Sequence, residues 1–204
     1  SGIEVVINAA AYTDVDGAQT SEGRIAAWQA NAVAVGNLAA AAAKIGATLV
    51  HFSTDYVFDG RTFPHTETEP LSPLGVYGQS KAAGDVAAST VAKHYLIRTS
   101  WVIGKGKNFV RTMIGLAEKG VSPSVVSDQT GRPTFVGQLV DAVELLLKTK
   151  ADFGTYNVSN DGPAVSWADL AREIFKQGGF PDIKVTDITT NGYNASKPNV
   201  ATRP

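Results

Sequence analysis

Three side chains with complementary chemistry gather in the stretch from Thr48 to Lys81. Thr54 ends a short apolar run, and Tyr77 and Lys81 lie four residues apart at the start of an expected helix. Residues with this spacing share one helix face, about one turn apart. A buried lysine ammonium beside a phenol favours the phenolate, which would make Tyr77 a usable proton donor or acceptor near neutral pH. With the Thr54 hydroxyl on the same substrate oxygen, the pattern predicts protonation of a carbonyl oxygen during hydride transfer.

The Tyr-x-x-x-Lys spacing is weak evidence when it stands alone, since it arises by chance in many chains. Its structural alternative is a surface lysine and a half-buried tyrosine that packs a helix against a sheet. The elements around the pair decide between the two interpretations.

Apolar runs and helical patterns alternate along the chain, as expected of strands buried on both faces of a parallel sheet. The expected elements are strand 3–8, helix 20–45, strand 48–53, helix 77–93, strand 95–100, helix 108–118, strand 121–127, helix 135–147, a strand near 156–158, a helix 166–176 and an irregular end at 189–204. Strand–helix alternation predicts an α/β fold with a doubly wound, Rossmann-like parallel sheet, whose ligands bind at the carboxyl ends of the strands.

Several marked residues fall at such strand ends. Small residues up to Ala11, followed by Tyr12, come directly after the first strand, and Trp101 comes after the third. Small side chains allow a ligand to approach the backbone, although they also suit tight packing of a strand against a helix.

Other polar residues leave two interpretations open. Asp14 and Asp16 could hold a metal, but two carboxylates without further ligands are more often helix caps or solvated. Asn31, polar among apolar neighbours, is either a structural amide or part of a catalytic site. The turn 128–134 carries amide, hydroxyl and guanidinium groups, which suit a ligand with sugar or phosphate groups but also occur in ordinary Gly-Pro loops.

Composition excludes several classes of function. The chain has 204 residues, 44% of them hydrophobic, and a net charge of −1, which argues against a nucleic acid or a membrane as partner. It has no cysteine, so disulfides and thiolate sites are excluded, and its three histidines (His51, His65 and His94) form no ligand cluster. No metal is expected. Without a long apolar run or a signal peptide, the expected location is the cytoplasm.

Five motifs in order carry a resemblance to a known family. They are NAAAYTDVD (8–16), STDYVFDG (53–60), SPLGVYGQSK (72–81), RTSWV (98–102) and DQTGRPT (128–134). Together they resemble dTDP-4-dehydrorhamnose reductases, which are extended members of the short-chain dehydrogenase/reductase superfamily. The resemblance covers nearly the whole chain.

The resemblance implies NAD(P)H-dependent reduction of the C4 ketone of dTDP-4-dehydro-L-rhamnose to dTDP-L-rhamnose, for cell-surface polysaccharide. Tyr77 would protonate the C4 oxygen, Lys81 would lower the pKa of Tyr77 and hold the nicotinamide ribose, and Thr54 would polarise the ketone. The cofactor, NADPH or NADH, would contact Ala11, Tyr12, Thr13, Phe52, Tyr77 and Lys81. The substrate would contact Thr54, Asp55, Trp101, Gln129 and Arg132. A homodimer is possible.

The chain also departs from the family pattern. No glycine-rich pyrophosphate motif precedes Ile3 or occurs later, and the residue that selects NADH or NADPH is absent with it. The chain is therefore expected to be an internal piece of a longer enzyme, and to bind cofactor poorly by itself. Residues 1–103 would be the later part of the cofactor domain and 104–204 mostly a substrate-binding lobe, with a helix and strand near 134–158 returning to the sheet.

Two alternatives to the reductase stay open, the first from another functional class and the second from the same superfamily. One is a non-catalytic binding module, like the regulatory subunit of methionine adenosyltransferase, which resembles the same family. The other is an epimerase or 4,6-dehydratase acting on a sugar nucleotide. A dehydratase would need further acidic residues beside Thr54, and only Asp55 is present there.

Overall fold

The computed structural model describes residues 2–197 and 199–204, which divide into two compact units. The first unit comprises 2–99, 146–158 and 199–204, and the second comprises 100–145 and 159–197. The domain limits expected from the sequence stay predictions about the whole protein.

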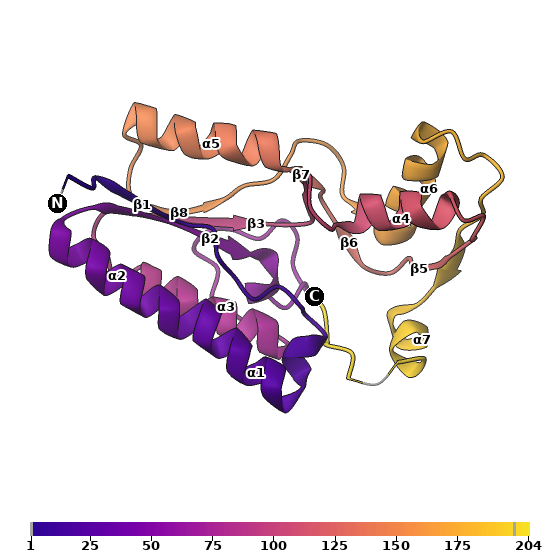
Figure 1. Ribbon diagram of the computed structural model, residues 1–204, viewed down its shortest axis with the longest axis horizontal. Helices are drawn as coiled ribbons and strands as arrows, with labels where there is room; N and C mark the ends of the chain where they lie inside the picture. The colour runs from indigo at the N-terminus through magenta and orange to yellow at the C-terminus, as the bar shows by residue number, and fades with distance from the viewer. Residues whose placement is uncertain (1, 198) are drawn as a thin grey trace. The chain divides into compact units, whose positions relative to one another are not determined.

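A four-stranded sheet with the order β1-β2-β3-β8 forms the centre of the first unit (Figure 1). Its strands are β1 (Val5–Asn8), β2 (Thr48–Thr54), β3 (His94–Thr99) and β8 (Gly154–Asn157). All three pairings are parallel, with Asn8 opposite His51 and Thr54 opposite Thr99. This confirms the predicted parallel α/β sheet. The first three strands therefore end at the same edge of the sheet. The candidate residues Ala11, Tyr12, Thr54 and Trp101 come at or after these strand ends in the sequence.

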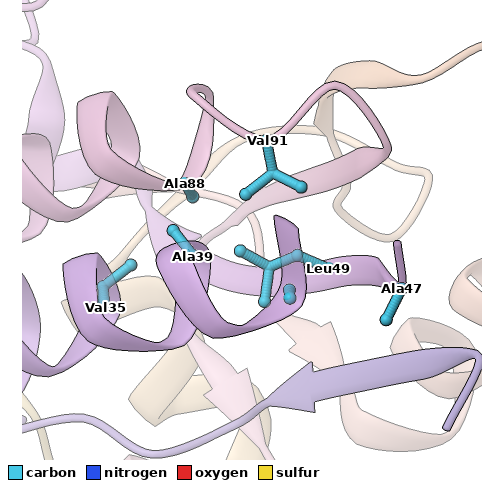
Figure 2. Packing of buried hydrophobic residues seen from close by; sticks show 7 residues of the cluster. Val35, Ala39, Ala47, Leu49, Ala88 and Val91 are labelled. Carbon is cyan, nitrogen blue, oxygen red and sulfur yellow. The ribbon is translucent and has the colours of Figure 1, made fainter. Parts of the chain in front are cut away.

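Helices α1, α2 and α3 lie together on one face of this sheet (Figure 1). They are α1 (Ser21–Trp28), α2 (Ala34–Ile45) and α3 (Val76–Ala88). Small side chains allow them to approach the sheet closely. A cluster of buried apolar residues from α2, β2 and the end of α3 fills the layer between them (Figure 2): Val35, Ala39, Ala42, Ala47, Leu49, Ala88 and Val91.

Two helix limits differ from those expected from the sequence. The first helix begins at Ser21 and not at Thr20, which is its cap, because Thr20 Oγ1 accepts a hydrogen bond from Gly23 N at 3.0 Å. Helix α3 ends at Ala88, well before Lys93. At the other end of this layer Gly46 stops α2 as predicted, with the left-handed φ of 70° that glycine adopts freely.

A π-helical turn, η2 (Gln29–Val33), interrupts the long helix predicted over 20–45. It lies next to helix α3, where space is very short. A Cβ added at Gly84 would lie 2.1 Å from the backbone oxygen of Asn31. The two helices therefore touch backbone to backbone, and only glycine fits at this position.

The buried side chain of Asn31 ties three segments together. Its Oδ1 accepts from Tyr12 N at 2.9 Å, and its Nδ2 donates to Tyr12 O and to Ser80 Oγ, both at 3.0 Å. Ser80 Oγ in turn donates to Tyr77 O at 2.7 Å. These bonds fix the segment after β1 against the first turn of α3. They favour the structural interpretation of Asn31 over the catalytic one.

The second unit packs helices α4 and α6 against short strands. Its elements are β4 (Val102–Ile103), α4 (Phe109–Ala117), β5 (Ser124–Val126), β6 (Thr130–Gly131), β7 (Thr134–Phe135), most of α5 (Val136–Thr149), β9 (Val165–Ser166), α6 (Trp167–Gln177), β10 (Thr186–Ile188) and α7 (Thr190–Ala195). Its core contains Met113, Ala117, Val125, Ala168, Ala171, Ile174 and Phe175. Helix α7 lies in the segment predicted to be irregular. That prediction was wrong, because Thr189 caps the helix by accepting from Gly192 N.

We expect Gly84→Ala to destabilise the protein by about 2–4 kcal/mol, because the new methyl group overlaps the Asn31 carbonyl. Gly36→Ala in α2 is the matched control, since no heavy atom lies within 4 Å of its added Cβ. The control should gain about 0.5–1 kcal/mol of helix propensity. Urea unfolding of both variants makes the comparison, and equal stabilities would contradict the close backbone contact.

We expect Asn31→Leu to cost about 2–4 kcal/mol, because the apolar side chain leaves the N–H and C=O groups of Tyr12 without their partner. Asn37→Leu, at an exposed position of α2, should change the free energy of unfolding by less than about 0.5 kcal/mol. Thermal unfolding compares the two. An equal loss of stability in Asn37→Leu would mean that a leucine on this helix is destabilising by itself. The hydrogen bonds of Asn31 with Tyr12 would then not explain the effect.

Candidate active site

Strand β2 and helix α3 bring Thr54, Asp55 and Tyr77 together within the first unit. Thr54 is the last residue of β2, and Asp55 opens the short 3-10 helix η3 (Asp55–Val57). Thr54 Oγ1 accepts from Tyr56 N at 3.2 Å and donates to Asp55 Oδ1 at 2.9 Å. Tyr77 lies in the first turn of α3, close enough to Thr54 for the threonine hydroxyl to influence its pKa.

Tyr56 fixes the position of Tyr77 from the other side. Its ring meets the Tyr77 ring edge-on, with the ring centroids 5.7 Å apart. A Cβ added at Gly78 would lie 2.2 Å from Tyr56 O, so the glycine after Tyr77 allows α3 to press against η3. Burial, followed by the charge of Asp55, raises the pKa of Tyr56 to about 12.

Tyr77 is a neutral phenol in this environment. Burial raises its pKa most, the charges of Asp55, Tyr56 and Asp85 raise it further, and the hydrogen bond with Thr54 opposes the shift. The prediction of a Tyr77 pKa lowered toward neutral was therefore wrong, because burial outweighs any stabilisation of the phenolate by the Lys81 charge. The side chain can donate a proton, and it does not exist as a standing phenolate.

The ammonium group of Lys81 is engaged elsewhere, which explains this difference. Its Nζ donates to Phe52 O in β2 at 2.6 Å, and the side chain is only 2% exposed. Burial lowers the pKa of Lys81 to about 8, while Asp85, one turn further along α3, opposes the shift. Asp85 itself pairs with Arg98 Nε at 3.0 Å. Lys81 is thus a buried cation held one helical turn beyond Tyr77.

The carboxyl group of Asp55 holds protons unusually well. Burial raises its pKa to about 6, while hydrogen bonds from Thr54 and from the backbone N–H groups of Asp55 and Tyr56, together with the charge of His65, oppose the shift. The group therefore changes charge within the physiological range.

Exposed small residues at the end of β1 leave backbone open to a ligand. Ala9, Ala10, Ala11 and Thr13 are exposed, and Tyr12 is half-buried and held by Asn31. Asn8 Nδ2 lies 3.0 Å from His51 Nδ1, which joins the ends of β1 and β2. Burial lowers the pKa of His51 to about 3, so this histidine is a neutral structural partner, as predicted.

Trp101, Gln129 and Arg132 belong to the second unit. Trp101 has a left-handed φ of 45°, and its ring stacks on Trp167 with centroids 3.4 Å apart. A Cβ added at Gly131 would lie 2.7 Å from the Trp101 ring, and Ser100 Oγ donates to Arg132 O at 2.7 Å. Trp101 and Arg132 are therefore neighbours, whereas Gln129 Nε2 donates to Thr190 Oγ1 at 3.0 Å.

The sequence did not predict that residues 199–204 would pack within the first unit and bond Asp16. Arg203 Nη2 and Ala201 N both donate to Asp16 Oδ1, at 2.7 and 3.0 Å. No local pattern links Asp16 to a residue so distant in sequence. Asp14 accepts from Gly17 N at 2.9 Å and caps η1 (Gly17–Gln19), so both carboxylates have structural roles.

The described part of the chain lacks two features. Within 2–197 and 199–204, no group of three or more histidine, cysteine, aspartate or glutamate side chains is arranged to hold a metal ion. Over the same residues, no helix is both long and apolar enough to cross a membrane.

Curated relatives resemble the chain over nearly its whole length. The spore coat polysaccharide biosynthesis protein SpsK of Bacillus subtilis (strain 168) is 39% identical over 201 residues, covering 97% of this chain and 69% of the relative. The dTDP-4-dehydrorhamnose reductase of Mycobacterium tuberculosis (strain H37Rv) is 38% identical, covering 96% of this chain and 66% of the relative. The chain thus spans about two thirds of the length of these relatives.

Solved structures agree with the sequence relatives. A dTDP-4-dehydrorhamnose reductase from Clostridium acetobutylicum matches with a TM-score of 0.89 and 41% identity, over 98% of this chain and 69% of that one. The enzyme from Bacillus anthracis in complex with NADP matches with a TM-score of 0.89 and 39% identity, over the same shares. The family described as the RmlD substrate binding domain matches residues 2–204. The resemblance found in the sequence is confirmed, and the chain belongs to the RmlD substrate binding domain family, among relatives of the dTDP-4-dehydrorhamnose reductases.

Proposed function

We propose that the protein containing this chain reduces the C4 ketone of dTDP-4-dehydro-L-rhamnose to dTDP-L-rhamnose with NADPH or NADH. The observation that carries the proposal is the buried Tyr77 phenol next to Thr54 at the start of α3, with the buried cation Lys81 one turn further along the helix. Relatives named as dTDP-4-dehydrorhamnose reductases share 38% and 41% identity with the chain, which supports the same substrate class.

Tyr77 supplies the proton in this proposal. Its raised pKa keeps it protonated, so it can donate to the oxygen of the ketone as negative charge develops there. Thr54 contributes a hydroxyl group to the same oxygen. The positive charge of Lys81 stabilises the tyrosinate that remains after the proton has left, because a nearby cation lowers the energy of an anion.

The residues at the ends of β1 and β2 fit a nicotinamide cofactor, which supplies hydride when bound. Exposed small side chains at Ala11 and Thr13 leave the backbone accessible, and Tyr12 is fixed by Asn31. Lys81 offers a cation beside Phe52 that suits ribose hydroxyl groups. We propose that these residues hold the cofactor, and the NADP complex of the Bacillus anthracis relative supports this assignment.

We propose that the substrate contacts Asp55 beside the reacting group and Trp101, Gln129 and Arg132 of the second unit. A guanidinium, an amide and an aromatic face together suit a nucleotide sugar with its diphosphate. A cytoplasmic location and a homodimer stay predictions.

We expect Tyr77→Phe to lower kcat by about 10²–10⁴-fold, because the variant keeps the ring packing against Tyr56 but lacks the proton donor. The measurement is the loss of nicotinamide absorbance when dTDP-4-dehydro-L-rhamnose is added to the protein as its gene encodes it.

Tyr156→Phe is the matched control for this substitution. Its hydroxyl donates to Asp152 O in the first unit, so its loss should leave turnover within about twofold of the parent. No NADPH or NADH oxidation by the parent protein, together with co-purification of a second polypeptide, would reject the reductase in favour of a binding module. An unchanged kcat in Tyr77→Phe would reject Tyr77 as the proton donor.

A further inference from the structure

The Thr54 hydroxyl group has a single hydrogen, for which more than one acceptor competes. A hydroxyl group donates once and accepts through its lone pairs. The N–H of Tyr56 occupies one acceptor direction at 3.2 Å, and the hydrogen is donated to Asp55 Oδ1 at 2.9 Å. An ionised carboxylate can only accept, so as long as Asp55 is charged the hydrogen of Thr54 points at Asp55.

This arrangement conflicts with the role of Thr54 in ketone reduction. A hydroxyl group that polarises a carbonyl oxygen must donate its hydrogen to that oxygen. Protonation of Asp55 removes the conflict, because a neutral carboxyl group can donate its own hydrogen to Thr54 Oγ1. The hydrogen of Thr54 is then free for the substrate.

We propose that Asp55 works in its protonated form as a positioning residue, which donates to Thr54 and thereby turns the Thr54 hydroxyl toward the substrate oxygen. The inference rests on the proposed reductase function and deepens it. Asp55 keeps its proton throughout the reaction, and the proton that reaches the product oxygen still comes from Tyr77.

The surroundings of Asp55 favour the neutral form. Its neighbours with titratable or hydrogen-bonding side chains are Thr54, Tyr56, Tyr77 and His65. Of these, His65 contributes a charge that favours the carboxylate of Asp55, and that imidazole is also engaged by Glu69 Oε2 at 2.9 Å. Burial raises the pKa of Asp55 to about 6, so the carboxyl group is protonated below that pH and ionised above it.

Other groups of the site titrate outside this window. Burial lowers the pKa of Lys81 to about 8 and that of His51 to about 3, and the pKa of Tyr77 is raised above its usual value near 10. A decrease in activity that begins near pH 6 therefore reports Asp55, provided that His65 is tested separately.

The test is the pH dependence of kcat/KM at saturating NADPH, which reports groups of the protein before substrate binds. For a group with a pKa of about 6, the protonated fraction falls about 25-fold from about pH 5.5 to about pH 7.5. We expect the parent protein to show this decrease, and His65→Gln to retain it.

Asp55→Asn should flatten the profile to less than about threefold over the same range. An amide cannot ionise, and its NH₂ group can donate to Thr54 Oγ1 in place of the carboxyl hydrogen. The variant is thus a permanent mimic of the protonated carboxyl group. A carboxylate that merely contacts substrate would instead give a higher KM and an unchanged pH profile.

Thr54→Val is the second variant, and it carries the test if Asp55→Asn does not fold. It removes the hydroxyl through which Asp55 acts, so its lower activity should also lose the decrease near pH 6. The proposal is overturned if the decrease persists in either variant, if it disappears in His65→Gln, or if the parent protein reduces the substrate without it. Absence of NADPH oxidation by the parent at every pH would instead reject the proposed function itself.

Discussion

Backbone contact around helix α3 is the constraint on which the candidate site depends. Gly78 allows the start of α3 to press against Tyr56 O, and Gly84 allows its middle to touch Asn31 O. Larger residues at either position would push α3 outward and carry Tyr77 and Lys81 away from the ends of β1 and β2. The π-helical turn at Asn31 follows from the same contact, because it lets one amide bond both Tyr12 and Ser80 without breaking the long helix.

Burial then sets the electrostatics of the side chains that this packing holds in place. It opposes charge on every ionisable group of the site, so Tyr77 and Asp55 favour their neutral forms and the pKa of Lys81 falls to about 8. A tyrosine that must donate a proton gains from a raised pKa as long as a cation can stabilise the tyrosinate when it forms. The hydrogen bond from Lys81 to Phe52 O holds such a cation one turn from Tyr77, without making the tyrosine ionise beforehand.

The sequence predicts the parallel sheet and the grouping of Thr54 with Tyr77, because both rest on local periods: continuous apolar strands, and a four-residue helical spacing. It does not predict the donor and acceptor directions of Thr54, or the hold of Phe52 O on Lys81, since these depend on contacts between segments far apart in the chain. The bond between Arg203 and Asp16 is the extreme case, since its partners are 187 positions apart in the sequence. The π-helical turn and the capped helix α7 were hidden for another reason: alanine-rich and polar segments carry little information about where a helix is interrupted or begins.

Trp101 shows that strain in the second unit lies where a substrate contact is proposed. A left-handed φ costs a residue with a side chain on the order of 1–2 kcal/mol, and this tryptophan adopts one directly after the third strand. Stacking on Trp167, close packing of Gly131 against the indole and the hydrogen bond from Thr134 N to Trp101 O offset that cost. Backbone conformations of this cost persist only where the surrounding packing holds them, and they cluster at ligand-binding and catalytic sites. The strained backbone therefore supports the assignment of Trp101 to substrate binding on grounds independent of the sequence motif.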